Sequence, residues 1–137
     1  MAATWEFRVA PGFEPTTAAR AARVLDQMGA FYADEVQRLM QTAPAGGRGY
    51  RRSNPGRFHK ASAPGEPPSP DLRTLIHSVA STGAGEGFRR VVRAGVTSAV
   101  AAGYVLLLEL GTARMRPRPA WLVALQNVRG IPRDVRG

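Results

Sequence analysis

The chain has 137 residues, of which 44% are hydrophobic, and it contains no cysteine. This composition fits one globular domain with its own core, and it excludes a disulfide framework and a thiolate metal site. The formal net charge of +9 is concentrated in two basic segments, 48–60 and 114–136, which predicts an acidic or polyanionic partner.

The N-terminal third predicts a strand followed by a long helix. Residues 4–10 alternate large apolar and charged side chains, and this period of two indicates a half-buried strand. From Pro15 to Thr42 the apolar spacing changes to three and four, which indicates a helix with a proline in its first turn. We expect it to be the core helix of the domain, and a helix lining a subunit interface is the alternative. Its apolar stripe would comprise Leu25, Met28, Tyr32, Val36 and Leu39, widened by Val24, Phe31 and Met40.

Residues 43–70 are rich in Pro and Gly and have almost no apolar periodicity, so we expect a long loop without regular structure. The loop carries the first basic cluster together with two aromatic residues, Tyr50 and Phe58. An arm that orders on a partner subunit is favoured, and a clamp for a nucleic-acid backbone with a stacked base is the alternative. The candidate partner contacts in the loop are Arg48, Arg51, Arg52, Arg57 and Lys60.

The middle of the chain predicts a short amphipathic helix over 69–79, a turn over 81–87 and a strand over 88–96 with its arginines facing solvent. Neither histidine, His59 or His77, has a second ligand at metal-binding spacing. We therefore expect no metal and no cofactor.

The C-terminal part begins with an apolar segment, 97–112, for which a helix ended by Gly111 is favoured over a buried strand at 104–110. A link alternating Arg with Pro follows, and 120–128 predicts a last short helix. The whole predicts an α+β fold, in which one long helix packs on a small, mainly antiparallel sheet. We expect a single domain over 1–128 and a flexible tail over 129–137.

Two blocks of the sequence resemble a family of small tailed-bacteriophage proteins, the neck, head–tail joining or tail-completion proteins. The first block runs from a tyrosine through "ELGT" and a basic link with a methionine to "RPAWLVAL"; the second, upstream, is "APGEPPSPDLRTLIHSV". Leu110, Trp121 and Val123 depart from the family pattern, and the Thr-Gly that precedes its upstream helix is missing. The matching positions in the first block are Tyr104, Glu109, Gly111, Thr112, Met115, Pro119, Leu122, Ala124 and Leu125, and in the second Pro64 to Pro68, Leu72 or Leu75, and Ser78.

The resemblance implies a ring-forming structural protein of the virion, assembled in the host cytoplasm. Its partners would be other copies of itself, neighbouring connector and tail proteins, and the DNA that passes through the ring. In this context we expect 99–110 to pack under the sheet and Gly111 to permit a sharp exit. Arg114, Arg116 and Arg118 would reach a neighbour from a link held extended by its prolines. Glu109 is either a surface acid at a helix end or a buried acid paired with an arginine.

Other functions fit the sequence less well. No Gly-rich phosphate loop, metal-ligand spacing or paired acids with an evident purpose are present, so we expect no enzyme activity. Neither a secretory signal nor an apolar run long enough to span a bilayer is evident, so we expect no membrane partner. Sequence-independent binding of nucleic acid is the main alternative, since the positive charge would bind phosphates in a salt-dependent way.

Overall fold

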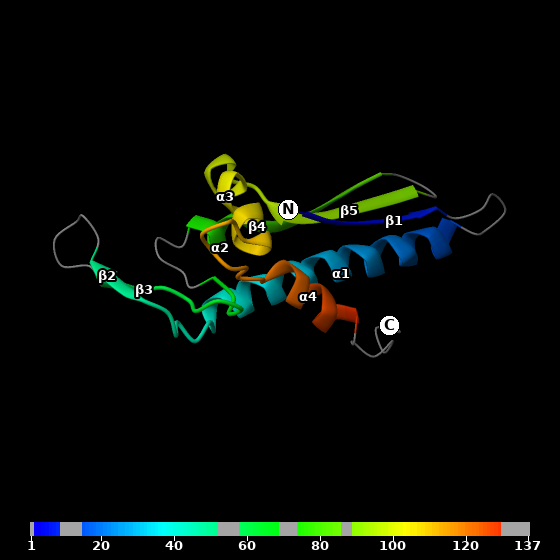
Figure 1. Cartoon of the computed structure of the whole chain (residues 1–137). Helices are drawn as coiled ribbons and strands as arrows, with labels where there is room; N and C mark the ends of the chain where they lie inside the picture. Colours follow the sequence, from blue (N-terminus) through cyan, green and yellow to red (C-terminus); the bar gives the residue numbers. More distant parts are fainter. Residues whose placement is uncertain (1, 9–14, 52–57, 69–73, 86–88, 130–137) are drawn as a thin grey trace.

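The computed structural model describes residues 2–8, 15–51, 58–68, 74–85 and 89–129. In these ranges the chain has the predicted α+β fold: a long helix packs on a small antiparallel sheet, and the shorter helices lie toward the C-terminal half of the long helix (Figure 1). The predicted tail lies, from residue 130 on, outside the described residues. The elements are β1 (Ala2–Arg8), α1 (Pro15–Gln41), β2 (Gly49–Arg51), β3 (Phe58–Lys60), α2 (Thr74–Ser78), β4 (Val79–Ala84), β5 (Arg89–Val96), α3 (Ala99–Leu110) and α4 (Trp121–Arg129).

The main sheet has the strand order β1-β5-β4, with both pairs antiparallel. In register, Trp5 lies opposite Val92, and Ser81 lies opposite Ala94. These residues face α1, because side chains alternate between the two faces of a strand and Trp5 contacts α1 through an edge-on ring contact with Tyr32 (5.2 Å between centroids). No described helix covers most of the opposite face.

Helix α1 confirms the predicted helix almost to the residue, but the predicted apolar stripe was partly wrong. Tyr32, Val36 and Met40 are buried as expected, whereas Met28 is 37% exposed and Phe31 is 47% exposed. The buried face is instead completed by small residues, because α1 lies close to the sheet. The buried residues of α1 are Ala18, Leu25, Gly29, Tyr32, Ala33, Val36 and Met40.

The segment expected to be a structureless loop contains a two-stranded hairpin, β2 with β3, that projects from the body of the domain (Figure 1). Its ladder continues toward the domain through a bond from the Gly47 N–H to the Ala61 carbonyl (2.9 Å) and one from the Ala61 N–H to the Arg48 carbonyl (3.1 Å). Strands of three residues leave no detectable period, so the sequence pattern could not reveal them. The hairpin is called the arm below.

The segment predicted as a turn at 81–87 is, up to Ala84, the edge strand β4, and Val79 opens this strand instead of ending a helix. The small residues of β4 had suggested a turn. They fit a strand under a close helix: a Cβ atom on Gly83 would lie 2.5 Å from the Asp26 carboxylate of α1. Asp26 also pairs with Arg90 of β5 (2.9 Å), so Arg90 lies on the helix side of the sheet and not, as expected, on the solvent side.

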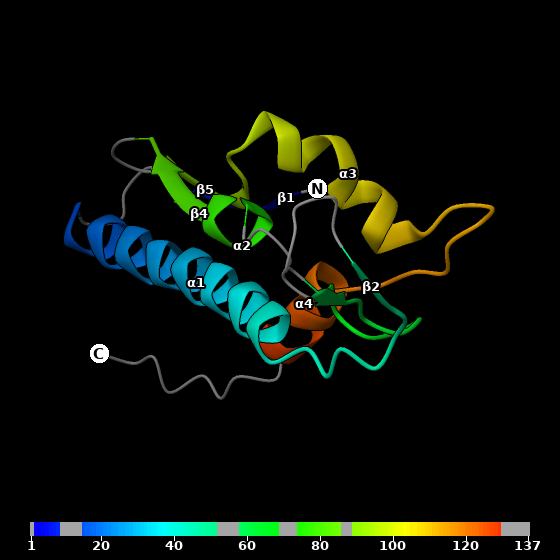
Figure 2. The same ribbon diagram turned by 90° about the vertical axis from the view of Figure 1, so that its left-hand side faces the viewer.

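Helix α3 lies at one end of the sheet, and α4 lies beside α1 (Figure 1, Figure 2). Ser98 caps α3 by accepting a hydrogen bond from the Ala101 N–H (3.3 Å), which confirms the helix over the alternative strand. Helix α4 packs on α1, where Trp121 and Ala124 join the core. No helix in the described ranges is both long enough and apolar enough to cross a membrane.

Candidate interaction site

The link between α3 and α4, residues 111–120, is a closed loop and not the extended arm that its prolines suggested. The Arg118 N–H donates to the Leu108 carbonyl of α3 (2.7 Å), which folds the link back on the helix it leaves. Before that, the Thr112 N–H donates to the Met115 carbonyl (2.7 Å), and the Thr112 hydroxyl accepts from the Met115 N–H (3.1 Å). The link is therefore a pre-formed surface feature with a fixed shape.

Gly111 ends α3 as predicted, although its conformation is not the left-handed turn that was expected. Its φ of 77° with ψ of −179° lies in a region that only glycine adopts readily. Space excludes a side chain as well, because a Cβ atom would lie 2.7 Å from the Met115 carbonyl oxygen and 2.8 Å from the Pro117 nitrogen. The sharp exit from α3 therefore depends on glycine at this position.

Glu109 is buried, with 6% of its surface exposed, and its partners are the backbone of α4. One carboxylate oxygen accepts the N–H groups of Ala120 (2.9 Å) and Trp121 (3.2 Å), and the other accepts that of Leu122 (2.6 Å). The first N–H groups of a helix have no partner inside the helix and carry a partial positive charge. Glu109 therefore acts as the N-terminal cap of α4 from a different helix, a role that neither sequence-based alternative anticipated.

Two aromatic residues connect this cap to the core. The Tyr32 hydroxyl of α1 donates to the Trp121 carbonyl (2.8 Å), and the two rings lie 6.0 Å apart. Burial, with a smaller contribution from the negative charge of Glu109, raises the pKa of Tyr32 to about 12. Tyr32 was predicted only as a core residue, and no spacing in the sequence relates it to Glu109 or Trp121.

The predicted basic contacts of the link differ in their surroundings. Arg114 and Arg116 are exposed to solvent. Arg118 is half-buried, and its Nε atom is buried without a hydrogen-bond partner. The apolar surface beside the link was not expected: Leu106 (47%), Leu107 (48%) and Leu110 (64%) of α3 are exposed, and so is Leu122 (53%) of α4.

The helix α3 thus does not pack under the sheet with its whole apolar surface. Its buried side consists of Ala101, Val105 and Glu109, spaced at one helical turn each. The opposite side of α3, which carries Leu106, Leu107 and Leu110, is not covered by any described part of the chain. The remaining family-motif positions, Tyr104, Met115 and Pro119, are half-buried around the junction, and Thr112 is exposed.

The arm brings the other predicted basic cluster to a projecting position. Arg48 and Lys60 are exposed, and Phe58, at 68%, is the most exposed large apolar side chain among the residues that the structure describes. The predicted contacts Arg52 and Arg57 lie outside the described residues, as does the side chain of Arg51. At the base of the arm, the Glu66 carboxylate accepts the N–H groups of Gly46 (2.9 Å) and Ala63 (2.7 Å), which lower its pKa.

The arm and the link are also joined to each other. The Gly65 N–H donates to the Pro117 carbonyl (2.9 Å), so both predicted basic segments start from one part of the surface. Beside the base of the arm, Ser62 is buried at 1% exposure and its hydroxyl has no hydrogen-bond partner.

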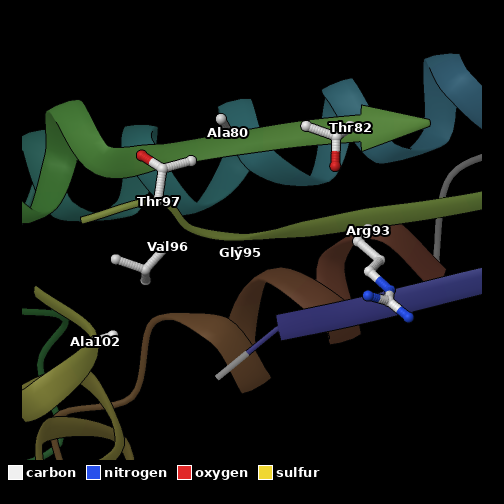
Figure 3. Close-up of a pocket in the computed structure, with 7 residues that line it drawn as sticks. All are labelled: Ala80, Thr82, Arg93, Gly95, Val96, Thr97 and Ala102. Carbon is white, nitrogen blue, oxygen red and sulfur yellow. The ribbon is translucent and has the colours of Figure 1, made fainter. Parts of the chain in front are cut away.

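A shallow hollow of about 310 Å³ lies between the open face of the sheet and α3 (Figure 3). Arg93 stands at one end, and Val96 and Ala102 at the other; the Thr97 hydroxyl already donates to the Ser78 carbonyl (2.8 Å). The described lining contains no carboxylate or histidine that could serve as an acid or base. The lining residues are Ala80, Thr82, Arg93, Gly95, Val96, Thr97 and Ala102.

His59 is buried in the arm and His77 is exposed on α2. Within the described ranges, no three histidine, aspartate or glutamate side chains gather where they could hold a metal ion.

Comparison with protein-family models, curated proteins and solved structures finds no match to this chain. The expected resemblance to phage neck proteins therefore has no support beyond the motif residues, of which Glu109 and Gly111 lie at the α3–link–α4 junction.

Proposed function

We propose that this protein is a structural subunit of a ring at the head–tail junction of a tailed phage or a phage-derived particle. The supporting observation is the junction itself. Glu109 and Gly111, two residues of the family-like motif, hold α3, the link and α4 in one fixed arrangement. That arrangement places exposed leucines next to exposed arginines on the surface.

Such a surface suits protein assembly better than catalysis. Exposed apolar residues that adjoin polar ones are typical of subunit interfaces, and arginine is favoured at such sites because it makes bidentate contacts with carboxylates. The rigid link also favours binding, because little conformational entropy is lost when a pre-formed loop docks.

The test is electron microscopy of the purified protein, alone and after mixing with connector or tail-tube proteins of the same particle. The proposal predicts closed rings of one size with a central opening, formed by the protein alone or on such a partner. If neither the protein alone nor any of the mixtures forms rings, the proposal is refuted.

Sequence-independent binding of nucleic acid is the second candidate, and the arm favours it. Lys60 lies two residues from Phe58 on the same face of a projecting hairpin, and Arg48 is exposed on the neighbouring segment; an exposed ring with basic groups can contact a base and a phosphate backbone. Binding to random-sequence DNA, measured as salt concentration rises, tests it. Affinity should fall steeply, because neutralised phosphates release counterions; affinity that does not respond to salt would exclude this mechanism.

A further inference from the structure

The surface of the domain has two separate apolar areas that no described part of the chain covers. The α1 strip consists of Val24 (38% exposed), Met28 (37%) and Phe31 (47%), which are spaced by one turn along one side of the helix. The α3 strip consists of Leu106, Leu107 and Leu110, extended by Leu122 at the start of α4. The two helices lie apart, and α2 contacts both of them (Figure 1, Figure 2).

The α3 strip contains a glycine that the fold of a single chain does not explain. Gly103 lies inside α3, on the same side as Leu106, Leu107 and Leu110, which follow it by three, four and seven residues. Glycine weakens a helix interior relative to alanine. A Cβ atom at this position would meet no other atom within 4 Å. A glycine on an uncovered helix face allows the backbone of another element to approach closely. No described element of the same chain makes this approach at Gly103.

The charge at one end of the α1 strip is complementary to the charges beside the α3 strip. Among the carboxylates of the described ranges, Asp34 is the one with neither an ion pair nor a hydrogen bond. It is exposed on α1 and follows Phe31 by three residues, so the two side chains are neighbours on the helix surface. The α3 strip is continued by the link, whose Arg114 and Arg116 are exposed and lie among no described carboxylates. An acid therefore borders the C-terminal end of the α1 strip, whose other end adjoins the exposed Arg20 and Arg23, and two guanidinium groups border the α3 strip.

We infer that the α1 strip of one copy packs on the α3 strip of the next copy, with Asp34 facing Arg114 and Arg116 and with Gly103 at the point of closest approach. This inference rests on the proposed ring and names its subunit contact. A contact between two different surfaces repeats from copy to copy, so it generates a closed ring when the rotation between neighbours closes. A pairing of α3 with α3 would instead stop at a dimer.

The test uses two double variants of the full chain. Met28→Gln with Phe31→Gln removes the α1 strip, and Leu106→Gln with Leu110→Gln removes the α3 strip; all four side chains are exposed, so the fold should persist by circular dichroism. Gln126→Ala is the control, because Gln126 is exposed on α4 and belongs neither to the two strips nor to the arm. The mass of each particle in solution is measured by sedimentation.

The expected result is that the control assembles like the parent, each double variant alone is a monomer, and an equimolar mixture of the two forms a dimer. The mixture can form a dimer and nothing larger, because each variant keeps one intact strip. Asp34→Arg should weaken assembly at least about tenfold, and Arg114→Asp with Arg116→Asp in the same chain should restore it. Gly103→Leu should abolish assembly but leave the monomer folded.

The other outcomes separate this contact from the ring itself. A parent that assembles while both double variants assemble equally well would overturn the contact and leave the ring proposal standing. An α1-strip variant that dimerises alone would show that α3 pairs with α3, and a mixture that stays monomeric would overturn the contact as well. A parent that is monomeric alone and on its assembly partners would overturn both proposals.

Discussion

Replacing Glu109 should destabilise the domain more than the loss of an ordinary surface carboxylate, because its side chain accepts three backbone N–H groups at a buried helix end. A hydrogen bond to a charged group contributes about 1.5–3 kcal/mol, and such contributions at one site are not additive. We therefore expect Glu109→Ala to lower the free energy of unfolding by about 4 kcal/mol. That is a large part of the roughly 5–15 kcal/mol typical of a domain.

The amide variant is the more specific test of the capping geometry. In Glu109→Gln the remaining oxygen can still accept from Ala120 and Trp121, but the amide NH₂ group would face the Leu122 N–H, so that two donors meet. We expect a loss of about 2 kcal/mol, between the parent and the alanine variant.

The assay is urea unfolding of the monomer, followed by circular dichroism and tryptophan fluorescence, with hydrogen exchange of the first α4 amides as a local measurement. Glu6→Gln is the control, because Glu6 forms its ion pairs with Arg8 and Arg89 at the surface, and its loss should leave the unfolding midpoint almost unchanged. A Glu109→Gln variant within about 0.5 kcal/mol of the parent, with unchanged exchange at 120–122, would refute the cap.

Three further perturbations test other parts of the fold. Tyrosinate absorbance should show one phenol ionising near pH 12, and Tyr32→Phe should remove that step; a titration complete near pH 10 would contradict the burial of Tyr32. Because the folded chain holds this proton more tightly than the unfolded chain, the related stability is complete below about pH 10 and is lost as the pH rises toward 12. Gly111→Ala should cost about 3 kcal/mol in urea unfolding, from its positive φ and its contact with the Met115 carbonyl, and a neutral effect would exclude the described exit from α3. Gly29→Ala should cost about 1–3 kcal/mol, because the new methyl group would lie 2.3 Å from Val92 Cγ1, and a stabilised variant would show that α1 sits farther from the sheet.

The sequence was most informative where a long periodic pattern meets a clear boundary. The long helix was predicted to within one residue of its described end, because Pro15 and Pro44 bracket an unbroken spacing of three and four. Strand β5 and helices α3 and α4 were found for similar reasons. The α+β fold followed from these elements together.

The errors arose where small residues or distant contacts decide the structure. Small residues in β4 resemble a turn locally, but they are required by the close approach of α1, which no local pattern records. Similarly, Val24, Met28 and Phe31 extend an apolar stripe in sequence, yet they lie beyond the area that the sheet and α4 cover. The apolar content of α3 suggested that the helix is buried on all sides, but the described chain buries only one side of it.

The candidate site could be predicted only in part. Motif resemblance selected Glu109 and Gly111, but the partner of Glu109 is the start of a helix eleven to thirteen residues later. Tyr32, from another part of the chain, also binds that helix start through the Trp121 carbonyl. Asp34 and Gly103 carry no sequence signal of their own. They stand out because the fold leaves one without a partner and the other without a neighbour.

The proposal that this protein is a self-associating ring subunit is tested first by the mass of the purified chain in solution. The measurement is made at low and high protein concentration and at two salt levels. A ring subunit should give one discrete oligomer, or a monomer that converts to that oligomer as concentration rises, and no series of ever larger particles. A protein that remains a monomer under all four conditions and also on preassembled connector or tail partners would contradict the proposal.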